Sequence, residues 1–551
     1  MNIRKDMPLN ARLLTAILAA MVALGSPTAS IAAESASSAP QAPSPRPTLV
    51  VSIIVEGLNA DYVDLLRSRM GSDGFNRLIA QGTTLRNVGY GPGIDATAAT
   101  AILMTGASPA VNGIPSDKVW DPVTRREHPV LLAPSQAGSY TFTQLTPEPL
   151  LVSTLADELR IADGGLGQVH VVSANPQSAI LLAGHAANSC FWLDPVKGNW
   201  VTSRYYSETP AVISKRNIGV TLAHRLDTMA WEPAIALDLY PDLPSYKKLY
   251  PFSHTFPPRE DARFEMFAQS PLAMRELTDI ASDYISTLKL GTRDVTDMVA
   301  LTADVTPYLY GRDADNRIET MDAYLRLDRD IARLIKAIEN GPGMSNTLFM
   351  VAGTPAPSGG KRDEERWHIP SGQFSPRKAI SLLNMYLIAI HGNGEWVCGY
   401  HNRFFYLNTD LIKERGIDLD LIRRQSAELL AKMSGVSEVY TIDDILTRRA
   451  GDDPAALQRN LTPACAGDLL IRVTPGWEIS DSSDEETTVE TTQTQHPVVR
   501  WQSTSSPVYI LAPSLTATEI TQPVDARAIA PTVARILRIR SPNAASLPPA
   551  L

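Results

Sequence analysis

The sequence predicts one large α/β domain built on a mostly parallel β-sheet with helices on both faces. Six of the eight residues in Thr48–Val55 are apolar and do not alternate with polar residues, which is typical of an inner strand buried on both faces. Similar runs follow at Val169–Ser173, Asp297–Thr302 and Thr347–Val351, with helical patterns between them. At 551 residues, with 44% hydrophobic and 20% charged residues, the chain has enough apolar residues for such a core.

The elements after the first strand are expected in a fixed order. A helix should run from Asp61 to Arg69, and a short second helix should occupy Gly74–Gly82. A Gly- and Pro-rich loop then ends near Asp95, which we expect to cap a helix of small residues, Ala96–Met104.

Ligands of open α/β sheets bind outside the carboxyl ends of the strands. Glu56, at the end of the first strand, and the N-terminus of the small-residue helix therefore mark the expected site.

The N-terminal segment has the pattern of a secretory signal peptide. Three basic residues precede an apolar run, Leu13–Leu24, and small residues continue to Ala33. We expect residues 1–33 to be a signal peptide and residues 34–48 to be a flexible leader, which predicts a periplasmic or secreted protein. An uncleaved N-terminal anchor is the alternative, but the apolar run is short for a membrane span. No membrane span is expected after signal removal, because no other long apolar stretch follows.

Charge and cysteine content narrow the possible partners. The formal net charge of −9 disfavours nucleic acid and gives no sign of a patch for anionic membranes. Cys190, Cys398 and Cys465 lie far apart and lack CxxC spacing, so a cysteine metal site is not expected. An exported protein permits disulfides, and Cys398–Cys465 is one possible pair. Buried free thiols are the alternative.

The domain is expected to be interrupted once. Residues 49–540 should form the α/β domain, with a small inserted α+β unit at about 365–450, and residues 541–551 should be a loose tail. The elements expected in the inserted unit are a strand at Tyr386–Ile390, a strand at Phe404–Leu407 and a helix at Asp418–Met433.

Short motifs along the chain occur in the order found in one known superfamily. They lie at Val55–Tyr62, Gly74–Leu78, Thr105–Gly106, Asn112–Ile114, Ala179–His185, Phe191–Asp194, Asp322–Asp328 and Ile529–Ala534. In this order they resemble the alkaline phosphatase superfamily, and most of all its PafA-like phosphatases and the related type I phosphodiesterase/nucleotide pyrophosphatase branch. The resemblance covers residues 49–540. It implies an alkaline-phosphatase-like sheet and explains the inserted unit, which such relatives share.

The resemblance also implies a mechanism. Members of the superfamily bind two zinc ions, and a Thr or Ser at the N-terminus of the small-residue helix attacks phosphorus to form a covalent phospho-enzyme. The metals activate that nucleophile and hold the leaving oxygen. Their ligands are carboxylates and imidazoles at strand ends, arranged close to tetrahedral around each ion.

The residues at the matching positions of this chain do not suit that chemistry. The nucleophile position is Ala96, which has no side-chain oxygen, and only Glu56 keeps a charged ligand type. The other metal-site positions are Pro307, Gly311, Gly353, Thr354 and Ser505. The positions that contact phosphate in the relatives are Asn175, Gln177 and Asp117.

These departures predict an exported, catalytically inactive pseudophosphatase with no bound zinc. Its crevice would then bind an unknown ligand or protein partner. The alternative is a phosphate mono- or diester hydrolase with a rebuilt metal site, which would use Thr97 or Thr100 as nucleophile and Glu56, Asp304 and His496 as metal ligands. A transferase or lyase of another class on the same scaffold is a third reading, because fold does not fix function.

Overall fold

The computed structural model describes most of the chain after its N-terminal segment. The described residues are 45–134, 138, 139, 141, 143–241, 243, 245–311, 315–355, 372–449, 451, 453–474, 477–479 and 505–551. The predicted signal peptide, nearly all of the predicted leader and His496 lie outside them.

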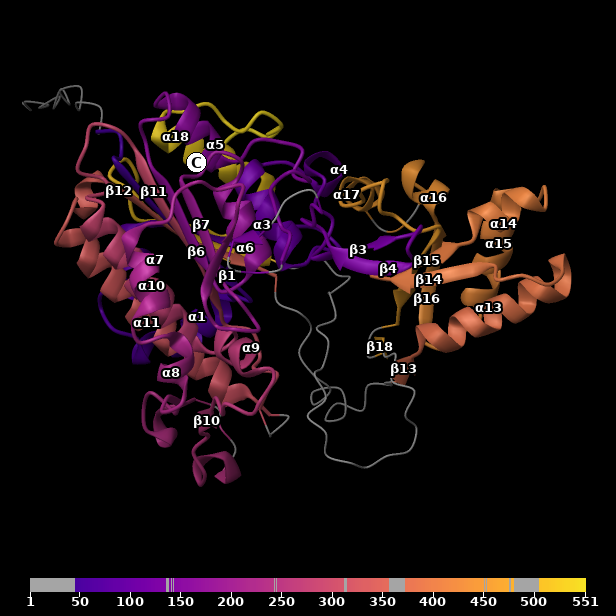
Figure 1. Cartoon of the computed structure of the whole chain (residues 1–551), viewed down its shortest axis with the longest axis horizontal. Coiled ribbons are helices and arrows are strands. Elements are labelled where there is room, and N and C mark those ends of the chain that lie inside the picture. Colours follow the sequence, from indigo (N-terminus) through magenta and orange to yellow (C-terminus); the bar gives the residue numbers. More distant parts are fainter. Residues whose placement is uncertain are drawn as a thin grey trace, which may run out of the picture. The chain divides into compact units, whose positions relative to one another are not determined.

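A mostly parallel sheet, with eleven strands among the described residues, forms the centre of the α/β domain (Figure 1). β1 (Leu49–Glu56) lies between β11 (Asp297–Asp304) and β12 (Thr347–Thr354) and is parallel to both. β6 (Val169–Ser173) pairs in parallel with β11, whereas β19 (Ser505–Leu511) runs antiparallel to β12. All four strands expected from apolar runs are present, so the predicted fold class is confirmed.

The remaining strands extend this sheet or form small two-stranded sheets. The sheet order is β20-β2-β19-β12-β1-β11-β6-β7-β8-β5, and β21 also pairs with β2. The other strands of the domain are β2 (Thr83–Gly89), β3 (Lys118–Asp121), β4 (Arg126–Pro129), β5 (Gly138–Ser139), β7 (Ser189–Leu193), β8 (Trp200–Ser203), β9 (Ala230–Trp231), β10 (His254–Thr255), β20 (Thr518–Ile520) and β21 (Val524–Asp525).

The two faces of β1 explain why the central strands carry so few polar residues. Val50 and Ile54 enter one hydrophobic core, and Val51, Ile53 and Val55 enter another on the opposite face. Helices line both cores (Figure 1). The first core is lined by α3 (Ala96–Thr105), α5 (Leu155–Ala162), α6 (Pro176–Ala183) and α18 (Ile529–Leu537). The second is lined by α1 (Ala60–Leu66), α2 (Phe75–Gln81), α7 (Ala211–Ile218), α8 (Leu222–Leu226), α9 (Arg263–Ala268), α10 (Pro271–Thr287) and α11 (Arg317–Glu339).

A separate small sheet and its helices form the inserted unit. Its strand order is β14-β15-β17-β16, and it packs around its own core, which includes Leu383, Leu387 and Phe405. The predicted strand at 404–407 and the predicted helix near 418–433 are confirmed. The bounds are α13 (Pro376–His391), β14 (Val397–His401), β15 (Phe404–Leu407), α14 (Thr409–Glu414), α15 (Leu419–Leu430), β16 (Val436–Thr441), α16 (Ile442–Leu446), α17 (Pro454–Arg459) and β17 (Leu469–Val473), with β13 (Gly372–Phe374) paired to β18 (Trp477–Ile479).

Two expectations for this unit are wrong. Residues 386–390 are not a strand but the end of helix α13, because Leu383 and Leu387 are buried at helical spacing while Met385 is exposed. The boundary at 450 is too early, since β17 pairs with both β15 and β16 inside the same sheet. The expected start at 365 lies outside the described residues.

The C-terminal segment 541–551 is not loose as expected. The backbone N–H of Ala550 donates to Thr532 Oγ1 at 2.8 Å, and the N–H of Asn543 donates to Ser153 Oγ at 2.9 Å. Ala544 and Leu551 pack against the first core. The segment is therefore held by apolar contacts and by hydrogen bonds to α18 and to the residue before the cap of α5.

The three cysteines are not joined to one another by disulfides. Cys190, Cys398 and Cys465 are free thiols, so the possible Cys398–Cys465 disulfide is not formed.

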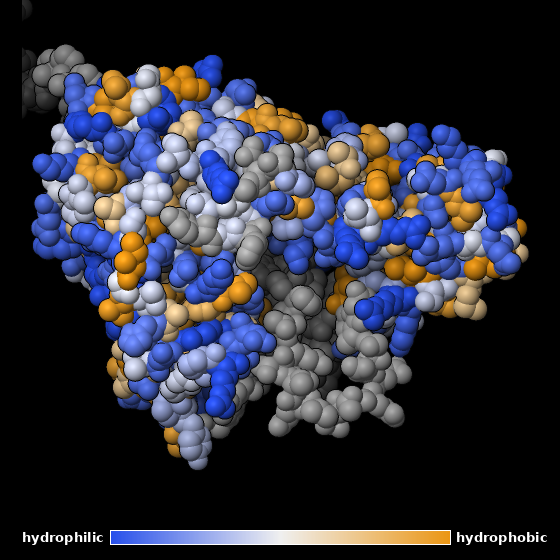
Figure 2. Space-filling model, viewed as in Figure 1, coloured by the Kyte–Doolittle hydropathy of each residue, from blue (hydrophilic) through white to orange (hydrophobic). Residues whose placement is uncertain are grey.

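Within the described ranges, none of the helices combines the length and the apolar character that crossing a membrane requires. Figure 2 shows a mainly hydrophilic surface on which apolar residues occur in small spots.

Candidate functional site

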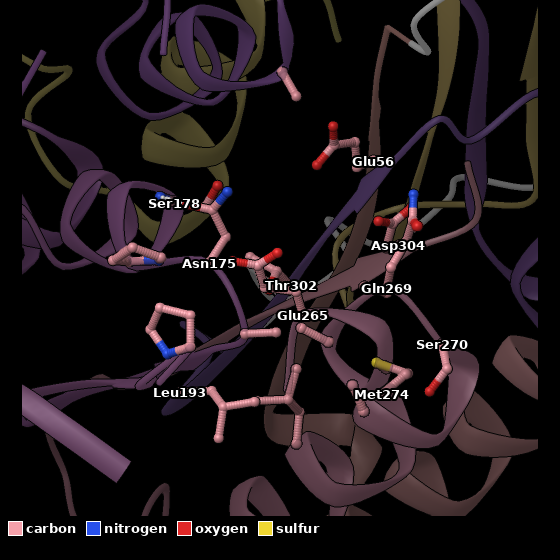
Figure 3. Close-up of a pocket in the computed structure, with 18 of the residues that line it drawn as sticks. Glu56, Asn175, Ser178, Leu193, Glu265, Gln269, Ser270, Met274, Thr302 and Asp304 are labelled. Carbon is pink, nitrogen blue, oxygen red and sulfur yellow. Dashed lines mark hydrogen bonds between the residues drawn. The ribbon is translucent and has the colours of Figure 1, made fainter. Parts of the chain in front are cut away.

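The carboxyl ends of three neighbouring strands bring Glu56, Asp304 and Thr354 side by side. Glu56 of β1 is in register with Asp304 of β11 and with Thr354 of β12. In-register residues of parallel strands face the same side of a sheet. All three line a cavity of about 320 Å³, which also receives side chains from α6, α9 and α10 (Figure 3). The cavity therefore lies where open α/β sheets bind ligands.

Glu56 and Asp304 are two partly buried acidic residues at neighbouring strand ends. Burial raises the pKa of Glu56 well above its ordinary value, and the charges of Asp304, Asp95 and Asp117 raise it further. Burial raises the pKa of Asp304 to about 6, although the hydroxyl and N–H of Thr306 partly oppose that rise. Both Thr306 groups donate to Asp304 Oδ1, at 2.6 and 2.7 Å. Asp304 is thus a turn residue that also faces the cavity.

The N-terminus of α3 is already occupied by a carboxylate of the protein. Asp95 caps the helix, as expected: one carboxylate oxygen accepts the N–H of Ala98 at 2.8 Å, and the other accepts the N–H of Asp117 at 2.7 Å. Burial raises the pKa of Asp95 to about 6. Ala96, the position of the family nucleophile, lines the cavity with a methyl group only.

The two threonines considered as substitute nucleophiles are engaged in the protein. Thr97 is buried, and its hydroxyl donates to Asp117 Oδ1 at 3.3 Å. The hydroxyl of Thr100 donates to the carbonyl of Ala96 at 2.8 Å, as a buried helical threonine commonly does. Thr100 lines the cavity, whereas Thr97 does not.

The positions that the superfamily resemblance assigns to phosphate contact form an internal hydrogen-bond network. Asn175 caps α6, and its side-chain oxygen accepts the N–H groups of Gln177 and Ser178 at 2.9 and 3.1 Å. The Gln177 amide donates to the carbonyl of Asp117 at 2.8 Å and also to the Asp117 carboxylate. A carboxylate therefore fills the place beside Gln177 where an anionic ligand would otherwise bind.

Gly353 is the position that the superfamily resemblance assigns to a zinc-binding aspartate, and the space beside it is filled. A Cβ atom added at Gly353 would lie 2.9 Å from the Cβ of Leu58 and 2.9 Å from the Cβ of Ser506. The Gly353 carbonyl accepts the hydroxyl of buried Tyr90 at 2.5 Å. A side chain cannot be added here unless neighbouring segments move.

The two zinc ions that the superfamily binds do not fit the residues at these positions. Pro307 and Gly311, which follow β11, offer no side-chain ligand, and Ser505 is exposed at the start of β19. Zinc in proteins requires three or four Cys, His, Asp or Glu ligands. In the part of the chain that the structure describes, no group of three such side chains is placed to hold a metal ion. The suggested substitute His496 lies outside that part.

Most of the cavity lining comes from residues that the sequence analysis did not assign to the site. Gln269 and Ser270, between α9 and α10, and Met274 of α10 form one side, and Leu193 at the end of β7 forms the end away from Glu56 (Figure 3). The sequence contains one relevant signal, the Ser270–Pro271 step, which marks a helix start. It does not indicate that this helix start faces Glu56.

Comparisons with known proteins agree with this fold. Residues 50–498 match the family described as type I phosphodiesterase / nucleotide pyrophosphatase. The chain is 28% identical over 523 residues to a protein of Myroides odoratus named calcium-transporting ATPase, covering 90% of this chain and 93% of that protein. It is 26% identical over 522 residues to alkaline phosphatase PafA of Elizabethkingia meningoseptica, covering 91% and 93%.

A solved structure shares the fold over nearly its whole length. The crystal structure of wild-type alkaline phosphatase PafA matches with a TM-score of 0.79 at 23% identity, covering 92% of this chain and 98% of that one. Together with the family match, which spans most of the sequence, this confirms the resemblance carried by the motifs. The chain belongs to the type I phosphodiesterase / nucleotide pyrophosphatase family and is a PafA-like member of the alkaline phosphatase superfamily.

Proposed function

We propose that this protein is an exported, catalytically inactive member of its family whose crevice serves in binding. The observation that carries the proposal is at Gly353, where the space for a zinc-binding side chain is filled by Leu58 and Ser506. Ala96 at the nucleophile position supports it, because a methyl group cannot attack phosphorus. Export to the periplasm or outside the cell is inferred from residues 1–33 of the sequence.

The charges around the cavity also argue against a phosphate ester as ligand. Glu56, Asp304 and Glu265 are acidic, and no lysine, arginine or histidine occurs among the described residues that line the cavity. A phosphate dianion placed between these groups would meet only like charges at short range, which is unfavourable without a metal ion. Enzymes that transfer phosphoryl groups instead surround them with cations and N–H donors.

The alternative, a hydrolase with a rebuilt metal site, has one supporting feature. Asp304 joins Glu56 at the strand ends and supplies a second carboxylate. One oxygen of Asp304 is held by Thr306, however, and Thr97 is outside the cavity. We therefore favour the binding role.

Zinc content and turnover, measured on one sample, test the proposal. The mature chain from Glu34 onward is expected to carry far less than one zinc per chain by elemental mass spectrometry. It should not hydrolyse p-nitrophenyl phosphate or bis-p-nitrophenyl phosphate, with or without added zinc, because the ligand set is missing. A zinc-dependent alkaline phosphatase run in parallel is the positive control. Near-stoichiometric zinc with zinc-dependent turnover would overturn the proposal.

A further inference from the structure

The Glu56 carboxylate faces the cavity without a partner. Among the described residues, no hydrogen bond or ion pair reaches it, and its nearest charged neighbours are the carboxylates of Asp304, Asp95 and Asp117. A carboxylate in a crevice among other carboxylates is unfavourable unless a proton or a cation neutralises it. This part of the crevice is therefore complementary to positive charge.

Thr354 gives a second and independent indication of a ligand. Its side chain is 1% exposed, and its hydroxyl has no hydrogen-bond partner among the described residues. It lines the cavity on the same side of the sheet as Glu56, with which it is in register. Buried hydroxyls are nearly always hydrogen-bonded, so an unpartnered one that lines a cavity indicates a missing donor or acceptor.

The cavity lining also has an apolar part. Leu193, Phe264, Met274 and Leu277 are each buried and line the cavity. Leu193 and Met274 lie on the side away from Glu56 (Figure 3). At about 320 Å³ the cavity is at the small end of the range for sites that bind small molecules. An inorganic cation would leave these side chains without a partner, whereas an apolar body attached to a cationic head would cover them.

Resting on the proposed binding role, we infer that the crevice takes a small organic ammonium cation with an apolar body. The ammonium group lies between the carboxylates of Glu56 and Asp304 and donates a third hydrogen bond to Thr354 Oγ1. The alkyl or aryl part packs on Leu193, Phe264 and Met274. A primary ammonium has three N–H donors and so can satisfy these three acceptors together.

Binding of n-hexylammonium to the mature full chain tests this inference. Calorimetric titration in phosphate-free buffer should show binding at one site, and the same ligand should raise the melting temperature. Methylammonium should bind at least about tenfold more weakly, because it lacks the apolar body. Hexanoate and hexyl phosphate have the same body with the opposite charge and should not bind.

Three variants test whether hexylammonium binds in the crevice. Asp304→Asn and Glu56→Gln keep the side-chain shape but remove the charge, and each should weaken hexylammonium binding by at least about tenfold. Thr354→Val should weaken it by a smaller factor, since only one hydrogen bond is lost. Glu260→Gln removes an exposed carboxylate just before α9 and outside the cavity, and is the matched control expected to bind like the parent.

The outcomes separate this inference from the proposed function. Suppose that the sample is free of zinc and inactive. If it then does not bind hexylammonium, or if all variants bind hexylammonium equally well, the inference is wrong while the proposed function stands. The inference is also wrong if hexyl phosphate binds more tightly than hexylammonium. It is wrong, too, if Mg²⁺ or Ca²⁺ binds more tightly than hexylammonium and that binding is lost in Asp304→Asn. Zinc-dependent turnover in the same sample overturns the proposed function itself.

Discussion

Replacing Gly353 with alanine should lower the free energy of unfolding by about 1–3 kcal/mol, the usual cost of overpacking a core. The added Cβ would lie 2.9 Å from the side chains of Leu58 and Ser506, and Gly353 is in the buried strand β12. Gly353→Asp introduces the residue type that the superfamily resemblance assigns to this position. It should cost more, about 3–5 kcal/mol, because it also buries an unpaired charge. Urea unfolding monitored by circular dichroism measures both changes.

Gly89→Ala is the matched control. Gly89 is a glycine in β2 of the same sheet, but an added Cβ would approach no atom closer than 3.9 Å, the Val524 carbonyl oxygen. Its expected effect on the free energy of unfolding is small. A Gly353→Asp variant that is as stable as the parent and takes up zinc would contradict both the packing argument and the proposed loss of function.

The fold could be predicted from the sequence because burial on both faces leaves a local pattern. Val50 and Ile54 face one core and Val51 and Ile53 the other, so the strand is an apolar run that only Ser52 interrupts. The same reasoning failed at Tyr386–Ile390, where the apolar run lies on a helix, half buried and half exposed. Short apolar runs do not distinguish strand from helix without their surroundings.

The site could be predicted only in part. The sequence placed Glu56 and Asp304 at strand ends, and parallel pairing then made them neighbours. It could not show that Leu58 and Ser506, from segments hundreds of residues apart, occupy the space beside Gly353. Nor could it show that Met274 and Leu193 line the same cavity, since that depends on how α10 packs on the sheet. Contacts between distant segments leave no local signal.

Asp304→Asn should make the protein more stable at pH 8 and give a smaller gain at pH 5. In the unfolded chain this carboxyl has its ordinary pKa of 3.8, whereas burial raises the folded value to about 6. The folded state therefore binds the proton more tightly. The resulting stabilisation is fully present below about pH 4 and is lost as the pH rises through 6. In the variant, the neutral amide oxygen still accepts the two hydrogen bonds from Thr306, and it has no charge to bury as the pH rises. The expected gain in the free energy of unfolding at pH 8 is therefore on the order of 1–3 kcal/mol.

Glu56→Gln should shift stability in the same direction, because the raised pKa of Glu56 has the same cause and the same sign. The two carboxylates repel each other, so the double variant should gain less than the sum of the single gains. Urea unfolding at pH 5 and pH 8 measures these differences, with Glu260→Gln as an exposed control that should show no pH-dependent gain. If either neutral variant loses stability by the same amount at both pH values, the carboxylates are held by favourable contacts. The crevice would then not be a site of uncompensated negative charge, and the case for a cationic ligand would fail with it.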